Sequence, residues 1–268
     1  MHTPPHTLPM VLAIGGHDPG GGAGIQADIE SITANGCHPA TVITCLTVQD
    51  SCNLSSLHPL KPAQMIAQAE AVLADCRVDA IKIGLIGDPL LAQALASLLK
   101  KHQGIPVVFD PVLATGGGND LASDRLLEII RNELLPYCSL ITPNSPEARR
   151  LCGADLPLDE CARTLLAGGV KSVLITGSHE QTSTVSNRLY DDSGLLDESH
   201  WERLPGEYHG SGCTLAAAIT AGVARGCSLL EAVRQGQSYS WESLKQGFRN
   251  GRCQSLPNRL YKLGRTPG

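Results

Sequence analysis

The chain has 268 residues, of which 42% are hydrophobic and 18% are charged, and its formal net charge is -5. Such a chain is long enough to bury a full core as one large domain or two small ones. The negative charge supplies no basic field for nucleic acid, and no apolar run approaches the roughly 20 residues that a membrane-spanning helix needs. Residues 1–10 lack the basic start and apolar middle of a signal peptide, so we interpret them as a loose leader and expect a cytoplasmic protein.

Short apolar runs alternate with helical patterns along most of the chain. Several runs are continuously apolar, which is typical of parallel strands buried on both faces. The predicted strands are 11–14, 41–48, 80–86, 106–112, 139–142 and 172–176. The predicted helices are 24–34, 62–75, 89–101, 121–135, 146–152, 159–167, 214–225 and 228–248. This alternation predicts an α/β fold of three layers, with a mostly parallel central sheet and helices on both faces.

One segment interrupts this alternation. Residues 187–196 carry turn residues between two short apolar pieces, which predicts a hairpin near the functional site. No linker, repeat or low-complexity tract divides the chain, so we expect a single domain over residues 11–250 and a C-terminal tail over 251–268. In open α/β sheets, ligands bind beyond the carboxyl ends of the strands, so function is expected in the loops that follow them.

The loop after the first predicted strand, residues 15–24, is rich in glycine, which lets a backbone approach a ligand closely. Residues 22–27 fit the G-x-G-x-x-A dinucleotide fingerprint, with Asp50 as a candidate ribose-binding acid. The match is weak, because Gly22 lies several residues beyond the strand, after a His-Asp-Pro turn. A Walker A loop is excluded, since no Gly-Lys-Ser/Thr occurs in the sequence.

Asp28 lies in the helix predicted over 24–34. Its position falls within or beside the arc that carries Ile25 and Ile32, so its carboxylate faces inward. A carboxylate on the inward face needs a partner. A ligand contact is favoured over a buried cap or ion pair, because the residue follows the glycine loop.

Residues 208–214 combine two glycines with small polar neighbours and precede an alanine-rich helix former. Several unpaired N–H groups therefore converge at a helix start, where they form an anion-binding site. Cys213 lies inside this site, where the helix dipole is expected to favour the thiolate and to lower the pKa of the thiol. A small residue needed only to pack the turn is the alternative.

The other cysteines have a simpler interpretation. Ten cysteines occur with no Cys-x-x-Cys and no metal-like pairing with histidine, which indicates a reducing compartment with mostly buried, inert thiols. His17 and His209 are not spaced as metal ligands either. We expect them in loop or substrate-gate roles, or facing solvent.

Six motifs stand in order along the chain, at 16–28, 42–50, 82–85, 110–112, 141–148 and 209–214. Together they resemble the hydroxymethylpyrimidine/phosphomethylpyrimidine kinases of thiamin biosynthesis, which have a ribokinase-like fold, and the resemblance spans about residues 11–248. It implies phosphorylation of 4-amino-5-hydroxymethyl-2-methylpyrimidine, and then of its monophosphate, with ATP and Mg²⁺. The implied partners are this small pyrimidine, ATP and a second copy in a homodimer, with no nucleic acid and no membrane.

The resemblance assigns a substrate pocket. Asp28 and Gln49 would hydrogen-bond the aminopyrimidine, since a carboxylate and an amide can match a ring nitrogen and an exocyclic amine. Gly16 and Leu85 would line the same pocket. Leu85 replaces a methionine that is common in the family, and this swap conserves volume.

The resemblance also places three polar residues at strand ends toward metal and phosphate. Asp110 and Glu147 would be ligands of Mg²⁺, and Asn144 would face the phosphates. Each has a simpler interpretation: Asp110 as a turn residue before proline, and Asn144 with Glu147 as a turn followed by a helix N-terminal acid. Their joint occurrence at strand ends favours the site.

The implied chemistry relies on the helix start. Backbone N–H groups of the catalytic run, Gly210, Ser211, Gly212 and Cys213, would stabilise the charge on the transferring phosphoryl group. Cys213 would take the proton of the hydroxymethyl group. The nucleophile of the second step is already largely anionic, so the thiol is expected to matter mainly for the first step.

The chain departs from the family pattern on the nucleotide side. Many members carry a lysine at the end of the strand that corresponds to 172–176, where this chain has Thr176 and Gly177. Threonine carries no charge, so another cation, with Arg188 as the candidate, would have to neutralise phosphate. A pyridoxal kinase of the same fold and a catalytically silent pyrimidine-binding protein are the alternative functions.

Overall fold

A single sheet organises the computed structural model, which describes residues 8–114 and 120–264. Within these residues its nine strands follow the order β3 (Leu54–Pro59), β2 (His38–Gln49), β1 (Met10–His17), β4 (Ala80–Ile83), β5 (Val107–Phe109), β6 (Leu140–Ile141), β7 (Val173–Ile175), β8 (Thr184–Asp191) and β9 (Gly194–Glu202). The six strands β2, β1, β4, β5, β6 and β7 run parallel to one another. Strand β3 pairs antiparallel at one edge, and β8 and β9 pair antiparallel at the other.

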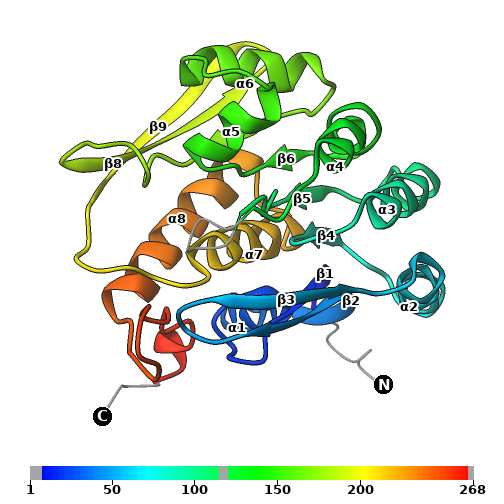
Figure 1. Cartoon of the computed structure of the whole chain (residues 1–268), viewed down its shortest axis with the longest axis horizontal. Helices are drawn as coiled ribbons and strands as arrows, with labels where there is room; N and C mark the ends of the chain where they lie inside the picture. Colours follow the sequence, from blue (N-terminus) through cyan, green and yellow to red (C-terminus); the bar gives the residue numbers. More distant parts are fainter. Residues whose placement is uncertain (1–7, 115–119, 265–268) are drawn as a thin grey trace, which may run out of the picture.

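Helices cover both faces of this sheet and give three layers (Figure 1). One face carries α2 (Pro62–Asp75), α3 (Pro89–Lys101), α4 (Asp124–Ile129), α5 (Ser145–Cys152) and α6 (Leu158–Ala167). The other carries α1 (Gly24–Ala34), α7 (Ser211–Ala224) and α8 (Leu229–Lys245). The predicted α/β architecture is confirmed.

The central parallel strands are mainly apolar because they are buried on both sides. Leu12 and Ile14 of β1 pack on the side of α2 and α3, whereas Val11 and Ala13 pack with α1 and α7. All four side chains are 0% exposed. Successive side chains of a strand point to opposite faces, so a strand covered twice needs apolar residues at every position.

Local sequence signals set most helix ends. Helices α1, α2 and α3 have the predicted bounds. Asp88 caps α3 by accepting hydrogen bonds from the backbone N–H groups of Leu90 and Leu91, at 2.8 and 3.1 Å. The helix predicted over 121–135 is shorter, since α4 is followed by a π-helical turn over Ile130–Leu134.

The hairpin is present as β8 and β9, but its turn lies away from the site. Tyr190 pairs with Val173 at the start of β7, whereas Arg188 pairs with Ile175 at its end. The turn at 192–193 therefore lies at the amino edge of the parallel strands. The predicted hairpin is therefore present, with its turn at the edge opposite the carboxyl ends of the parallel strands, because β8 runs antiparallel to β7.

The segment expected as a tail packs against the rest of the chain in its described part, 251–264. Asn258 and Arg259 are 0% and 1% exposed. Isolated bridges join Tyr208 to Ser255 and Phe248 to Leu256. At the other end of the chain, residues 1–7 of the expected leader lie outside the described residues, and β1 already begins at Met10.

A disulfide bond joins Cys52, in the loop between β2 and β3, to Cys253 of the C-terminal segment. This pairing was not foreseen, because the two residues stand 201 positions apart in sequence. The remaining eight cysteines are free thiols, and five of them are buried, which fits the expectation of mostly buried thiols.

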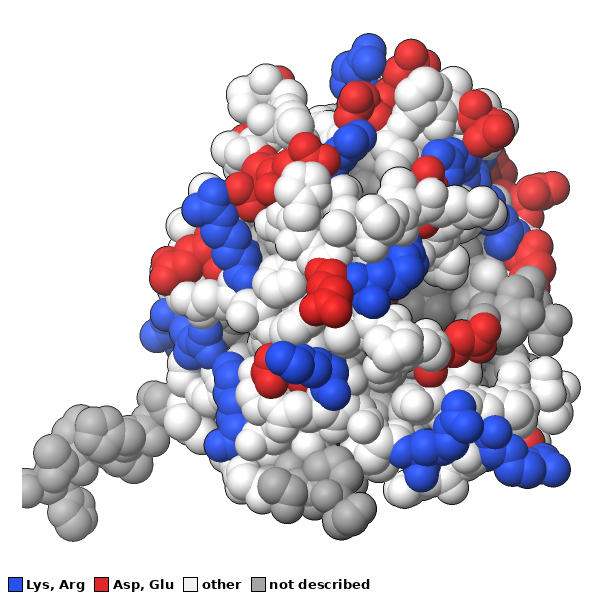
Figure 2. All heavy atoms as spheres, turned by 90° about the vertical axis from the view of Figure 1, so that its left-hand side faces the viewer, with Lys and Arg blue, Asp and Glu red and all other residues white. Residues whose placement is uncertain are grey.

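The surface offers no broad field of one sign on the side that holds the start of α7. Figure 2 shows this side, the left of Figure 1, with Lys and Arg interspersed among Asp and Glu. Among the helices of residues 8–114 and 120–264, none has both the length and the hydropathy that crossing a membrane requires.

Candidate active site

The start of α7, where the anion site is predicted, lies at the carboxyl edge of the sheet. Gly210 is its N-cap with φ +80°, a left-handed conformation that favours glycine, and among the described residues no side chain caps the helix start. A Cβ atom on Gly210 would overlap the carbonyl oxygen of Gly22, so the glycine loop and the helix start are in direct contact. Gly212 is exposed, which leaves this first turn open to a ligand.

Cys213 follows in the same turn and is only 8% exposed. Burial raises the pKa of its thiol to about 12, and the charges of Asp110 and Asp28 add to this, although Lys82 opposes it. The expectation that the helix start lowers the pKa of this thiol is therefore wrong for the free protein. Loss of hydration of the thiolate outweighs the helix dipole.

Asp110 follows β5 and faces the same turn. Its carboxylate oxygens lie 3.6 Å from the position that a Cβ atom on Gly212 would take. Burial raises the pKa of this carboxyl to about 6, although the neighbouring Cys213 thiol acts to lower the pKa. Its Oδ2 is buried without a hydrogen-bond partner in the described structure, so the site holds a carboxylate oxygen that a ligand can use.

Glu147 and Asn144 form a reciprocal capping box at the start of α5. The side chain of Asn144 accepts from the backbone N–H of Glu147 at 2.9 Å, and the Glu147 carboxylate accepts from the N–H of Asn144 at 2.9 Å. The other Glu147 oxygen accepts from the N–H of Leu113 at 3.3 Å. Burial, followed by the charge of Asp110, raises the pKa of Glu147 to about 8. Asn144 and Glu147 thus form the turn and the helix N-terminal acid that their simpler interpretation predicts. Glu147 also lies close enough to Asp110 to sense its charge.

Asp110 and Glu147 could together hold a magnesium ion. Among the described residues, no cluster of three or more His, Cys, Asp or Glu is arranged as a complete metal cage. Mg²⁺ is usually held by one or two carboxylates, with substrate phosphates and water completing the shell. The unpaired Oδ2 of Asp110 and the repulsion between Asp110 and Glu147 fit such a partial site.

The residues of the predicted substrate pocket lie at or just after the ends of three strands. A Cβ atom on Gly16 would lie 3.0 Å from the sulfur of Cys45 and 3.1 Å from Cδ2 of Leu85, so Gly16 leaves room for the leucine. Gln49 is held at the end of β2, where its Nε2 donates to Oγ1 of Thr47 at 2.9 Å. The structure brings Gly16 and Leu85 together, and it orients Gln49 through its neighbour.

Asp28 has a different environment from the one expected. Its carboxylate lies 2.9 Å from the ammonium of Lys82, and both side chains are 0% exposed. The structure therefore supplies an ion-pair partner from β4, which is the alternative interpretation, while the ligand contact of Asp28 stays a prediction. Lys82 was missed, although one signal was available: it is the single charged residue in the apolar strand Ala80–Ile83.

On the nucleotide side, Arg188 already has carboxylate partners. Arg188 lies 2.8 Å from Glu198 and 3.6 Å from Asp159, so two carboxylates already neutralise its charge. Its strand neighbour Leu189 packs with α7, which turns Arg188 toward the opposite face and α6. The charge of Arg188 is therefore already balanced in the free protein, and its contact with nucleotide phosphate stays a prediction.

Thr176 and Gly177 directly follow β7, and Thr176 lies next to Asn144. Thr176 forms a bridge with Asn144, and its side chain is half-buried. The N–H of Gly177 donates to Oδ1 of Asn187 at 3.1 Å, and a Cβ atom on Gly177 would overlap the carbonyl oxygen of Ser186. Because Gly177 has no side chain, the chain after β7 can lie close to β8. The N–H of Gly177 is already engaged by the side chain of Asn187 in β8.

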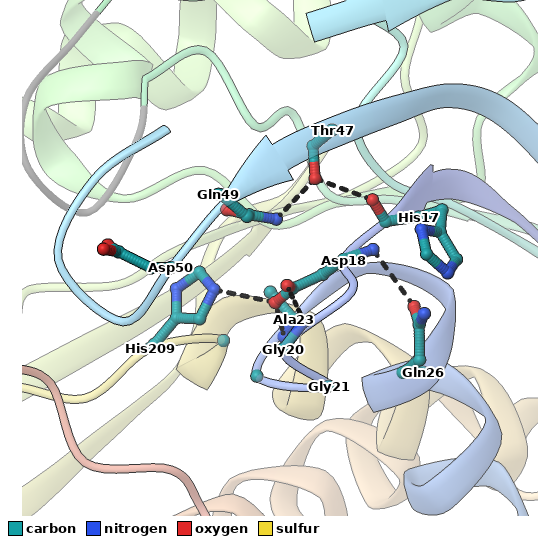
Figure 3. A network of polar contacts seen from close by, with 12 residues as sticks. His17, Asp18, Gly20, Gly21, Ala23, Gln26, Thr47, Gln49, Asp50 and His209 are labelled. Carbon is teal, nitrogen blue, oxygen red and sulfur yellow. Dashed lines mark hydrogen bonds and ion pairs between the residues drawn. The ribbon is translucent and has the colours of Figure 1, made fainter. Parts of the chain in front are cut away.

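A polar network joins the glycine loop to the residue before the anion site (Figure 3). Asp18 is 3% exposed and accepts from the N–H groups of Gly20 and Ala23, each at 2.8 Å. Its Oδ2 also lies 2.9 Å from Nε2 of His209. His209 is therefore engaged by a carboxylate, and it connects two loops that are 191 residues apart.

Comparisons with known proteins agree with this geometry. Residues 18–258 match the model of the phosphomethylpyrimidine kinase family. The chain is 37% identical to a hydroxymethylpyrimidine/phosphomethylpyrimidine kinase of Streptomyces coelicolor, over 92% of each chain. It is 34% identical to the thiamine biosynthesis bifunctional protein ThiED of Geobacter sulfurreducens, but that match covers 93% of this chain and only 52% of the relative.

Solved structures show the same likeness. The fold superposes on a phosphomethylpyrimidine kinase from Clostridium difficile with a TM-score of 0.77 and 30% identity, over 88% of this chain and 99% of the other. An ADP complex of Bacillus subtilis pyridoxal kinase gives a TM-score of 0.88 with 28% identity, over 95% and 98%. The fold is therefore that of the ribokinase-like vitamin kinases, and the chain is a phosphotransferase that belongs to the phosphomethylpyrimidine kinase family.

Proposed function

We propose that this chain uses ATP and Mg²⁺ to phosphorylate 4-amino-5-hydroxymethyl-2-methylpyrimidine and then its monophosphate, in thiamin biosynthesis. One observation carries the proposal: Asp110 and Cys213 meet at the open first turn of α7. The names of the relatives supply the substrate class. The complexes of Staphylococcus aureus pyridoxal kinase with ADP and with AMP-PCP support the use of ATP.

The N–H groups of Gly210 to Cys213 would bind the transferring phosphoryl group. Phosphoryl transfer spreads negative charge over the equatorial oxygens, and a helix start offers fixed N–H groups and the positive end of a dipole. Asn144 and Thr176 lie at neighbouring strand ends and would contact the phosphates as hydrogen-bond partners. This arrangement suits a nucleotide that is positioned by polar groups rather than by the family lysine.

Cys213 would accept the proton of the hydroxymethyl group. Its thiol is protonated in the free protein at neutral pH, and the charge of Asp110 contributes to this. Mg²⁺ held by Asp110 and Glu147 would neutralise the charge that opposes the thiolate and would screen the phosphates. The ammonium of Lys82, which is buried beside this site, would then stabilise the thiolate of Cys213.

The pocket formed by Gly16, Leu85 and Gln49 would hold the pyrimidine. Gly16 and Leu85 offer an apolar wall, and Gln49 can both donate to a ring nitrogen and accept from an exocyclic amine. Asp28 would act indirectly, because its carboxylate pairs with the ammonium of Lys82 and would not contact the pyrimidine ring. Pyridoxal is the competing substrate, because pyridoxal kinases share this fold closely.

We also propose a homodimer built on the outer face of β2. Leu46 and Val48 are 45% and 53% exposed there. A second copy would bury these side chains, which are otherwise costly to expose together. Light scattering of the wild-type protein and of Leu46→Asp tests this, and a monomeric wild type would contradict it.

A product assay tests the activity. The protein is incubated with ATP and Mg²⁺ and with either hydroxymethylpyrimidine or pyridoxal, and mono- and diphosphates are measured by mass spectrometry. We expect a pyrimidine monophosphate followed by a diphosphate, with Cys213→Ala slowing the first step more than the second. Phosphorylation of pyridoxal alone, or tight pyrimidine binding without turnover, would overturn the proposal.

A further inference from the structure

Arg259 lies in the C-terminal segment, outside every motif that the sequence singled out, and yet it is 1% exposed. Its guanidinium is shared among three elements. Nε donates to Oγ1 of Thr214 in the first turn of α7 at 2.8 Å, and Nη1 donates to the carbonyl of Gly21 at 3.2 Å. Nη2 donates to the carbonyl of Gly22, and Nη1 also lies 3.2 Å from Oε2 of Glu30 in α1.

These contacts converge where the glycine loop meets the anion site. The position of a Cβ atom on Gly210 would be 2.8 Å from Nη2 of Arg259 and would overlap the carbonyl of Gly22. Gly210, Gly22 and the guanidinium are therefore packed as one unit. A planar group with several donors in fixed directions suits this task, because it can hold two carbonyls and a hydroxyl at once.

Helix stability does not explain a cation at this place. A positive charge beside a helix N-terminus opposes the dipole of the helix, so the first turn of α7 gains nothing electrostatically from Arg259. The ion pair with Glu30 balances this charge, so Arg259 serves the site through its fixed hydrogen-bond donors rather than through its charge. Arg188, expected to supply charge to the phosphates, is neutralised on the other face of the sheet.

The segment that carries Arg259 is itself fixed. The hydroxyl of Tyr239 in α8 donates to the carbonyl of Arg259 at 2.7 Å, and the N–H of Asn258 donates to the carbonyl of Ser243 at 2.8 Å. Next to the anion site, the N–H of His209 donates to the carbonyl of Ser255 at 2.9 Å. The guanidinium is thus presented from a rigid support.

We propose that Arg259 is a positioning residue for phosphoryl transfer, which holds the glycine loop and the first turn of α7 in the geometry that binds the transferring phosphoryl group. The inference rests on the proposed function. Arg259 acts through Gly21, Gly22 and Thr214 and does not touch the substrate. Its loss should therefore lower kcat more than it weakens pyrimidine binding.

Three variants test this role. Arg259→Met keeps the stem but removes the charge and the donors, and Arg259→Lys keeps the charge with a single donor group. Tyr239→Phe is the matched control, because it removes one anchor of the same segment and leaves the guanidinium intact. For Arg259→Met we expect kcat to fall at least about 10-fold with the KM for the pyrimidine within about threefold, whereas Arg259→Lys should be intermediate and Tyr239→Phe close to wild type.

Hydrogen exchange supplies a readout that does not depend on activity. In Arg259→Met, the amides of residues 18–24 and 210–215 should exchange faster together, and in Tyr239→Phe they should not. A wild-type protein without pyrimidine kinase activity would refute the proposed function, while the exchange comparison would still decide the positioning role. A folded Arg259→Met with kcat within about twofold of wild type, or an equal loss in Tyr239→Phe, would overturn the inference. If Arg259→Met does not fold, wild-type kcat in Arg259→Lys overturns it equally.

Discussion

Lys82 and Asp28 form a fully buried ion pair beneath the glycines of the site. A Cβ atom on Gly84 would lie 2.6 Å from Nζ of Lys82, so this glycine makes room for the ammonium. Burial alone disfavours the ammonium, but the charges of Asp28, Cys213 and Asp110 outweigh this and raise the pKa of Lys82. Lys82 thus stays charged and offsets three acidic groups near the start of α7.

Lys82→Met should destabilise the protein by roughly 3–5 kcal/mol, because it leaves the Asp28 carboxylate buried without a partner. The double variant Lys82→Met/Asp28→Leu should recover much of that loss. Urea unfolding of the wild type, both single variants and the double variant measures the coupling. Additive effects of the two single substitutions would show that the pair is not coupled.

Asp18 is the second buried carboxylate that organises the site. Burial raises the pKa of Asp18, but hydrogen bonds from His209 and from the N–H groups of Gly20 and Ala23 outweigh it and lower the pKa below 3.8. A carboxyl whose pKa is depressed in the folded state stabilises the protein at pH values above its unfolded pKa. This stabilisation is lost as the pH falls through the folded value.

We therefore expect wild-type stability to decline as the pH drops below about 4, and Asp18→Asn to show a smaller decline. Urea unfolding at about pH 3, 4 and 5 measures the difference between the two proteins. Asp88→Asn is a matched control, since Asp88 accepts two backbone N–H bonds at the start of α3, away from the site. Parallel curves for wild type and Asp18→Asn would contradict the expected linkage.

At the scale of elements, the site depends on where two helices begin. The start of α7 is left without a side-chain cap within the described residues, so its N–H groups remain available for a ligand. The start of α5 is fully capped by Asn144 and Glu147. The start of α7 would therefore serve binding, whereas the start of α5 fixes Asn144 and Glu147 beside Asp110.

Asn144→Ala removes the cap of α5 and should cost about 1 kcal/mol of stability. Ser123→Ala is its matched control, because Ser123 caps α4 by accepting from the N–H of Leu126 at 3.3 Å, outside the site. Both variants should lose similar stability in thermal unfolding, but only Asn144→Ala should lower kcat/KM for ATP. Equal activity of the two variants would mean that Asn144 serves α5 alone.

At the scale of the whole molecule, the C-terminal segment closes the chain onto its beginning. The disulfide Cys52–Cys253 fastens this segment to the β2–β3 loop, and Arg259 fastens it to the glycine loop. Cys253 is exposed, so a reductant can reach the bond. The C-terminal segment thus links the β2–β3 loop to the glycine loop of the candidate site.

Cys52→Ser/Cys253→Ser should destabilise the protein by up to about 5 kcal/mol, since the bond closes a loop of about 200 residues in the unfolded chain. Reduction of the wild type by dithiothreitol should lower its Tm to that of the double variant. Calorimetry with and without the reductant measures both effects. An unchanged Tm would show that Arg259 and the backbone contacts hold the segment without the disulfide.

Periodicity and local signals determined the architecture from sequence. The parallel strands are buried on both faces and are therefore continuously apolar, and the helices start at prolines and capping residues that act within a few positions. The glycine and cysteine run at the start of α7 was likewise visible, because a helix start needs only its own residues. Strand β3 was missed, since an exposed edge strand has no such apolar pattern.

Only the tertiary structure decided which charges meet. The partner of Asp28 lies 54 residues away in β4, and the residues that Arg259 holds lie up to 238 residues away. The pKa of the Cys213 thiol was also misjudged, because it depends on burial among Lys82, Asp110 and Asp28 rather than on the helix that carries it. Local sequence governs backbone conformation within a few residues, whereas burial and electrostatics are set by neighbours that the chain brings together only on folding.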